Sequence, residues 1–202
     1  MQRTGVMLTS RERIRDAAKA LFSERGYDAT STAAIARLAG TSESQLIKHF
    51  ENKQGLLEAI YQYAWEQINP AVRLATDSIS MPREKVRIMM EMVLNFLERD
   101  EQLRTLFLLE GRRNRDDGHM IVLVPGFLEF VKVFDGILNQ LADRGELAAG
   151  VHPQAFRSAL FGAIEGMLRD KMLARTSSFP ATYSSSDLRT MAFKFLSSAL
   201  NE

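Results

Sequence analysis

The sequence predicts an all-α protein, with a three-helix helix-turn-helix domain followed by a larger helical domain and about nine helices in total. Apolar residues recur at spacings of three and four along most of the chain, and no run alternates between apolar and polar residues as a half-buried strand does. Proline and glycine divide the chain into segments of helical length. Two short apolar patterns also lie on either side of Gly40, as in a helix-turn-helix.

The first helix is expected to begin after Thr9, because Thr9 and Glu12 have the spacing of a capping box. Apolar residues then repeat at helical spacing: Ile14, Ala17, Ala18, Leu21 and Phe22. Gly26 follows and can adopt the positive φ that ends a helix. This helix supplies one side of a small N-terminal core.

A second, short helix is expected to begin at Thr30 or Ser31 and to end at Gly40. Its inward face would consist of Ile35, Leu38 and Ala39. Ser42 and Gln45 form an S-x-x-Q capping box for the next helix. The turn between the two helices therefore has a chemical signal at each end.

The third helix would face inward through Leu46 and Phe50, which are four residues apart. That orientation leaves six residues on or near the surface: Glu43, Ser44, Gln45, Ile47, Lys48 and His49. A helix-turn-helix presents its second helix to the major groove of DNA in this way. The alternative is a helical hairpin inside an ordinary α-domain, because short motifs match by chance.

Beyond Leu57 the pattern remains helical, and the boundary between a DNA-binding domain and a regulatory domain is expected between residues 53 and 54. The predicted domains are thus residues 1–53 and 54–202. Helices are expected over the following ranges: 52 to the mid 70s with a possible kink at Pro70, 82–98, 101–112, 124–143, 153–174 and 186–200. The charged run 112–118 is expected to be a solvated loop.

Composition is that of a cytoplasmic globular protein. The 202 residues are 46% hydrophobic, enough for a sizeable core, and the absence of cysteine excludes disulfides and thiolate metal sites. No apolar run approaches the roughly 20 residues that span a bilayer, and no signal peptide is evident. Residues 1–53 contain 9 basic and 6 acidic residues against 17 and 19 in residues 54–202, so the weak positive bias lies where DNA would bind.

An ordered series of short segments between about residues 10 and 60 resembles the DNA-binding domain of the TetR/AcrR family of bacterial transcriptional regulators. The segments are Arg11-Glu-Arg-Ile14, Ala17-Ala18, Leu21-Phe22, Gly26-Tyr27, Thr30, Ile35-Ala36, Ala39-Gly40, His49-Phe50, Asn52-Lys53 and Gly55-Leu-Leu57. The resemblance implies a dimeric DNA-binding regulator, most often a repressor. It does not extend to the rest of the chain, and it departs from the family at Ile47, usually tyrosine, and Thr41, often valine.

The resemblance implies that Thr32, His49 and Lys53 contact phosphates, while residues 43–48 face the bases. The predicted DNA-binding set is Thr32, Ser42, Glu43, Ser44, Gln45, Ile47, Lys48, His49 and Lys53. Within it, Gln45 suits adenine, Glu43 could accept from cytosine N4, and Ile47 could contact a thymine methyl. A carboxylate at position 43 would nevertheless face a field of phosphates, and the operator sequence is not predictable.

The last two helices are predicted to form a homodimer interface through Gly162, Gly166, Leu188, Met191 and Phe195. The two glycines, four residues apart, let another helix approach closely. Both apolar stripes could equally pack within one chain. The family's four-helix bundle of paired final helices favours the dimer, which would contact a palindromic double-stranded operator.

A small-molecule inducer is predicted among helices rich in methionine and phenylalanine. The candidate residues are Met89, Met92, Phe96, Phe107, Glu110, Phe130, Phe134, Phe161 and Glu165. The alternative is an ordinary filled core, with the carboxylates at the surface or paired with Arg112, Arg113 or Arg169.

The predicted function is a ligand-responsive transcriptional repressor, and the alternative is a DNA-binding or architectural protein with no small ligand. An enzyme is the rival from another class. Against it, the three histidines lie in no catalytic or metal-binding motif, and Asp116-Asp117 is only a loose carboxylate pair. We therefore predict no catalytic residue, no cofactor and no metal.

Overall fold

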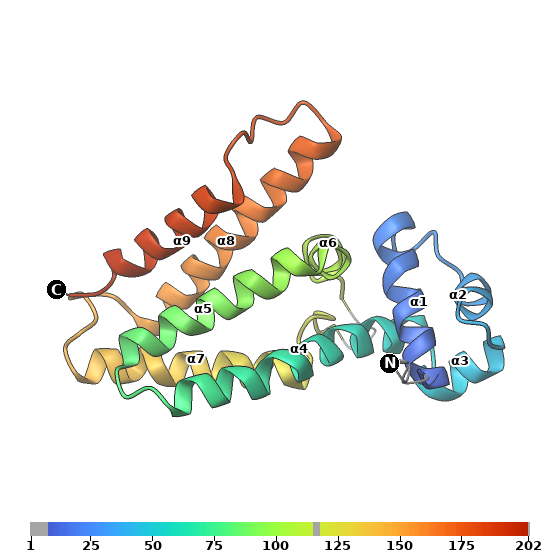
Figure 1. The fold of residues 1–202 in the computed structure, drawn as a ribbon, viewed down its shortest axis with the longest axis horizontal. Coiled ribbons are helices and arrows are strands. Elements are labelled where there is room, and N and C mark those ends of the chain that lie inside the picture. Colours follow the sequence, from blue (N-terminus) through green and yellow to red (C-terminus); the bar gives the residue numbers. More distant parts are fainter. Residues whose placement is uncertain (1–7, 115–117, 202) are drawn as a thin grey trace, which may run out of the picture. The chain divides into compact units, whose positions relative to one another are not determined.

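The computed structural model describes residues 8–114 and 118–201, and within these ranges the chain forms nine helices (Figure 1). They are α1 (Ser10–Arg25), α2 (Thr32–Leu38), α3 (Glu43–Phe50), α4 (Lys53–Asp77), α5 (Pro82–Arg99), α6 (Glu101–Glu110), α7 (Pro125–Asp143), α8 (Pro153–Thr176) and α9 (Ser185–Ser198). The all-α prediction is confirmed. No helix in the described part is long and apolar enough to cross a membrane. Residues 115–117 of the predicted charged loop, including Asp116 and Asp117, lie outside the described residues.

The helices form two compact units. The first comprises residues up to 64 together with 100–125, and the second comprises 65–99 and 126 onward. Helix α4 contributes to both, because the division falls at its Ala64. These are units of internal contact, and the functional domain boundary at residues 53 and 54 stays a prediction.

In the first unit, α1 packs against α2, α3 and α6. The fully buried side chains at this junction include Ile14, Phe22, Ile35, Leu46 and Leu106. Leu38 was expected to join them, but it is 57% exposed. The buried face of α2 is centred between Ile35, Ala36 and Ala39, and Leu38 lies about 100° around the helix from that centre.

Local capping chemistry fixes the helix ends of the first unit. Thr9 and Glu12 form the predicted reciprocal capping box of α1, and Gly26 ends that helix with φ of 84°. Gly40 adopts a φ of 62° between α2 and α3, as the turn requires. The hydroxyl of Ser42 then accepts from the amide of Gln45 at 3.3 Å and starts α3.

Acid should weaken the start of α1. The backbone amide and hydroxyl of Thr9 both donate to Glu12, which holds the pKa of Glu12 below its ordinary 4.5. A lowered pKa in the folded state means that this contribution to stability is complete above the unfolded pKa and is lost as pH falls through the folded value. An NMR titration should place the Glu12 midpoint below 4.5, and Thr9→Ala should raise it. A midpoint at or above 4.5 in the wild type would contradict the cap.

The second unit contains the rest of α4 together with α5, α7, α8 and α9. A line of aromatic contacts crosses its core, with ring centroids 4.9 Å apart between Trp65 and Phe130 and 5.2 Å apart between Phe134 and Phe161. Helices α8 and α9 lie side by side and run in opposite directions (Figure 1). Arg189 joins α9 to α5, where its guanidinium donates to Glu91, Glu98 and Asn95. Hydrogen bonds to Glu98, followed by the nearby carboxylate charges, raise the pKa of Arg189.

Candidate nucleic-acid interface

Helix α3 is anchored on one face and open on the other. Leu46 and Phe50 are 0% and 5% exposed, as predicted, and they fix the rotation of the helix about its axis. Five side chains of the opposite surface are exposed: Glu43, Ser44, Gln45, Ile47 and Lys48. Ser42 at the cap is exposed, and His49 is half-exposed. The structure therefore brings together on one surface the residues that were predicted to read base edges.

Glu43 is held by α2. The hydroxyl of Thr32 donates to the carboxylate of Glu43, which joins the first turns of α2 and α3. The carboxylate also lies in the first turn of α3, where the helix dipole favours a negative charge. A phosphate approaching Thr32 would compete with Glu43 for the same hydroxyl, which is a constraint that the sequence pattern did not reveal.

Lys53 stands at the first position of α4 and turns toward the preceding chain. Its ammonium donates to the backbone carbonyls of Tyr27 at 2.9 Å and Thr30 at 3.1 Å. It also lies 4.2 Å from the centre of the Tyr27 ring, as a cation–π contact. Because an ammonium has three donors, one remains for a phosphate. Lys53 thus stabilises the loop between α1 and α2 as well as supplying charge.

The same loop is joined to the end of α6. Arg113 donates to Asp28 at 2.7 Å and to Glu110 at 3.0 Å, and Glu110 accepts from the backbone amide of Tyr27 at 3.3 Å. The hydrogen bond to Asp28 is the largest cause of the raised pKa of Arg113. Arg113 also covers the Tyr27 ring at 4.5 Å. The Tyr27 ring therefore contacts two cations, Lys53 and Arg113.

Two predicted ligand residues belong to this first unit and have internal partners there. Glu110 is paired with Arg113, as the alternative reading of the carboxylates expected. Phe107 lies against the ring of Tyr61 at 4.8 Å. Tyr61 is fully buried, and burial raises the pKa of its hydroxyl, which donates to the carbonyl of Leu106 at 2.9 Å.

The other predicted ligand residues lie in the second unit, where many are packed core. Met89, Phe130 and Phe134 are at most 3% exposed. Four more are half-exposed: Met92, Phe96, Phe161 and Glu165. Glu165 pairs with Arg169 at 3.6 Å, again as the alternative reading expected. A ligand role for these residues stays a prediction.

The predicted dimer residues on α8 and α9 divide into two groups. At Gly162 and Gly166 a Cβ would meet no atom within 4 Å, so the space beside α8 is open in one chain. Met191 is 53% exposed, and Phe195 is half-exposed while stacking on Phe156 at 5.7 Å. Leu188, by contrast, is 2% exposed and already packs within the chain.

Comparison with known proteins gives consistent matches. Residues 14–60 match the sequence model of a family described as bacterial regulatory proteins, tetR family. The fatty acid metabolism regulator protein of Bacillus subtilis is 24% identical over 152 residues, which are 74% of this chain and 77% of that protein.

Solved structures share the fold at low sequence identity. FadR of Bacillus subtilis in complex with stearoyl-CoA superposes with a TM-score of 0.80 at 21% identity, covering 94% of this chain and 98% of that one. AibR in complex with isovaleryl coenzyme A and operator DNA gives a TM-score of 0.71 at 19% identity, covering 92% and 97%.

Proposed function

We propose that this chain, which belongs to the TetR family of bacterial regulatory proteins, is a repressor and binds a palindromic DNA operator as a homodimer. Membership of this family identifies the chain as a DNA-binding transcriptional regulator and not an enzyme. The observation that carries the proposal is the open surface of α3, held at a fixed rotation by Leu46 and Phe50. A helix supported in this way can enter a major groove without rearrangement of its own core.

In the proposed complex, base contacts come from α3 and phosphate contacts come from its two flanks. Gln45 is exposed near the start of α3 and has the bidentate amide that pairs with adenine. Ile47 is 45% exposed and offers an apolar surface for a thymine methyl. Thr32, His49 and Lys53 would contact phosphates and set the register of the helix in the groove.

Two copies are required because one short helix reads only a half-site. Paired recognition helices must reach successive major-groove faces, about 34 Å apart. The open side of α8 at Gly162 and Gly166, together with exposed Met191 on α9, supports pairing through these two helices.

The proposed inducer is a small amphipathic molecule of the acyl-coenzyme A or fatty acid class. Support comes from similar proteins, which include a fatty acid metabolism regulator and two regulators solved in complex with stearoyl-CoA and isovaleryl coenzyme A. Such a ligand releases the operator only if it binds the DNA-incompetent form more tightly than the DNA-competent form. A melting-temperature and operator-affinity screen against acyl-CoA thioesters tests this part.

Selection of bound DNA from a random library tests the DNA-binding part. The wild type should enrich a palindrome with half-sites about one helical turn apart. Gln45→Ala should relax preference at one or two base pairs, at about 1–3 kcal/mol of lost discrimination, because the adenine contact disappears.

Lys53→Ala serves as the contrasting variant in the same selection. It should weaken binding on all sequences alike and reduce the salt dependence, because it removes a phosphate contact. Its unfolding free energy must be measured alongside, since Lys53 also binds two carbonyls. A wild-type protein that enriches no sequence in the absence of ligand would overturn the proposed function, and an unchanged profile for Gln45→Ala would remove its role as a reader.

The second candidate function is a DNA-binding regulator with no small ligand. It is favoured by the complete burial of Met89 and Phe134, two residues expected to line a ligand cavity. A screen in which no amphipathic molecule changes either melting temperature or operator affinity would select this alternative.

A further inference from the structure

Glu43 places a negative charge on the surface that is proposed to face DNA. Its side chain is exposed in the first turn of α3. Within residues 8–114 and 118–201 no cation pairs with its carboxylate, and the one hydrogen bond that this carboxylate accepts comes from the hydroxyl of Thr32. The charge of Glu43 is therefore not neutralised by the described part of the chain, and it repels any DNA phosphate that comes near.

The hydroxyl of Thr32 can serve only one of two acceptors. A hydroxyl carries a single proton, so it donates either to the Glu43 carboxylate or to a phosphate oxygen. Thr32 is half-exposed at the start of α2, which leaves it within reach of a phosphate. A phosphate bound there would lie beside the Glu43 carboxylate, and the two anions would repel each other. Contact between Thr32 and a phosphate therefore requires the Glu43 side chain to move away.

A displaced Glu43 carboxylate needs another donor. In the major groove the donors on base edges are the amino groups of cytosine and adenine, and carboxylates pair with cytosine N4 in direct readout. The edges of guanine and thymine offer this carboxylate no donor. Glu43 stands in the first turn of α3, the part of a recognition helix that contacts base edges. The base opposite that turn thus decides whether Glu43 gains a new hydrogen bond or only loses the old one.

We propose that Glu43 couples base reading to phosphate binding and so acts as a specificity-determining residue. On DNA with a cytosine amino group opposite the start of α3, the carboxylate moves to that group and releases Thr32 to a phosphate. On other sequences the carboxylate keeps Thr32 and repels the backbone. The inference rests on the proposed operator binding and adds a penalty against wrong sequences, which attractive contacts alone do not supply.

The test is a double-mutant cycle between Glu43→Ala and Thr32→Val, measured by fluorescence anisotropy with the full-length protein. One duplex is the palindrome that the wild type enriches, and the other is a scrambled sequence of the same length. With Glu43 present, Thr32→Val should weaken palindrome binding at least about 3-fold and scrambled binding less than about 2-fold. With Glu43→Ala, the loss should be the same on both duplexes, because the hydroxyl is then free on every sequence.

Glu43→Ala alone should change the two affinities in different ways. It should strengthen binding to the scrambled duplex about 3-fold or more, because a charge that repels phosphates is removed. It should also remove the preference for cytosine at one position of each half-site, since the acceptor for N4 is lost. Library selection with this variant reads out the second effect directly.

Glu51→Ala is the matched control. Glu51 is an exposed acid at the opposite end of the same helix, so its replacement removes the same charge from the same unit. It should change the affinities for the two duplexes by one common factor and leave the effects of Thr32→Val as they are in the wild type. Equal helical circular dichroism in all variants confirms that folded proteins are being compared.

The remaining outcomes overturn the inference. If Glu43→Ala weakens binding to both duplexes and Thr32→Val costs the same on each, the pair only joins α2 to α3, and operator binding still stands. If scrambled binding rises after Glu43→Ala while no base preference changes, Glu43 repels the backbone without reading a base. A wild type that enriches no palindrome overturns the proposed function together with this inference, so the two failures are distinguishable.

Discussion

Leu46→Ala should destabilise the first unit by about 2–5 kcal/mol and abolish operator binding, whereas Ile47→Ala should change stability by less than about 0.5 kcal/mol. Leu46 is 0% exposed beneath α3, so its removal leaves a cavity at the junction of α1 and α3. Ile47 is the next residue, has the same number of carbon atoms and is 45% exposed. Because a typical domain is stable by about 5–15 kcal/mol, the first loss is a large fraction of the total.

The two variants distinguish a residue that supports the recognition helix from one that contacts the bases. Denaturant unfolding of both variants gives the stability difference, and operator titration gives the binding difference. Ile47→Ala should remain folded and change only the preference at the base pairs that it contacts. Equal stability losses in the two variants would contradict this orientation of α3, because they would require Ile47 to be buried as deeply as Leu46.

Features that depend on nearby residues were predictable from sequence. The Thr9 and Glu12 box, the positive φ at Gly26 and Gly40, and the inward side chains Leu46 and Phe50 all formed as expected. Each depends on interactions within about one or two helical turns, so spacing alone defines it. The same reasoning located all nine helices in the described ranges.

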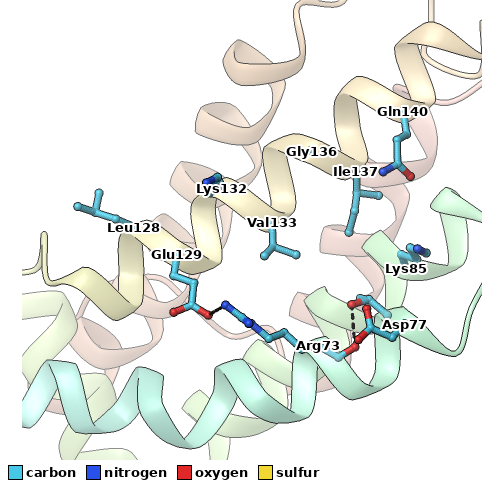
Figure 2. Close-up of a pocket in the computed structure, with 11 residues that line it drawn as sticks. Arg73, Asp77, Lys85, Leu128, Glu129, Lys132, Val133, Gly136, Ile137 and Gln140 are labelled. Carbon is cyan, nitrogen blue, oxygen red and sulfur yellow. Dashed lines mark hydrogen bonds and ion pairs between the residues drawn. The ribbon is translucent and has the colours of Figure 1, made fainter.

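Features that depend on distant partners were not predictable. Lys53 binds carbonyls 23 and 26 residues earlier in the chain, and Arg113 binds Asp28, 85 residues away. Glu110 carried the pattern of a carboxylate that interrupts an apolar face, and only the fold shows that it accepts from Tyr27. A groove lined by residues of α4, α5 and α7 was also missed, because its lining comes from three helices that only the fold brings together (Figure 2).

Met191→Glu should dissociate the proposed homodimer and reduce operator affinity about 100-fold or more. In a dimer, binding of one DNA-binding domain holds the second at a high effective concentration near its half-site, and separate monomers lose this advantage. Met191 is 53% exposed in one chain, so a carboxylate at this position remains solvated in the monomer and should not unfold it. In the dimer the same change would bury two carboxylates at one interface without partners, which is costly. Analytical ultracentrifugation gives the mass, and operator titration gives the affinity.

Met81→Glu is the matched control, because the substitution introduces the same charge into the same unit. Met81 is 57% exposed and lies between α4 and α5. The variant should leave mass and operator affinity unchanged. If both variants remain dimeric, the open sides of Gly162 and Gly166 do not mark the interface, and pairing must use another surface. If Met191→Glu is monomeric but still binds the whole operator as tightly as the wild type, dimerisation is not what places the two DNA-binding domains on the two half-sites.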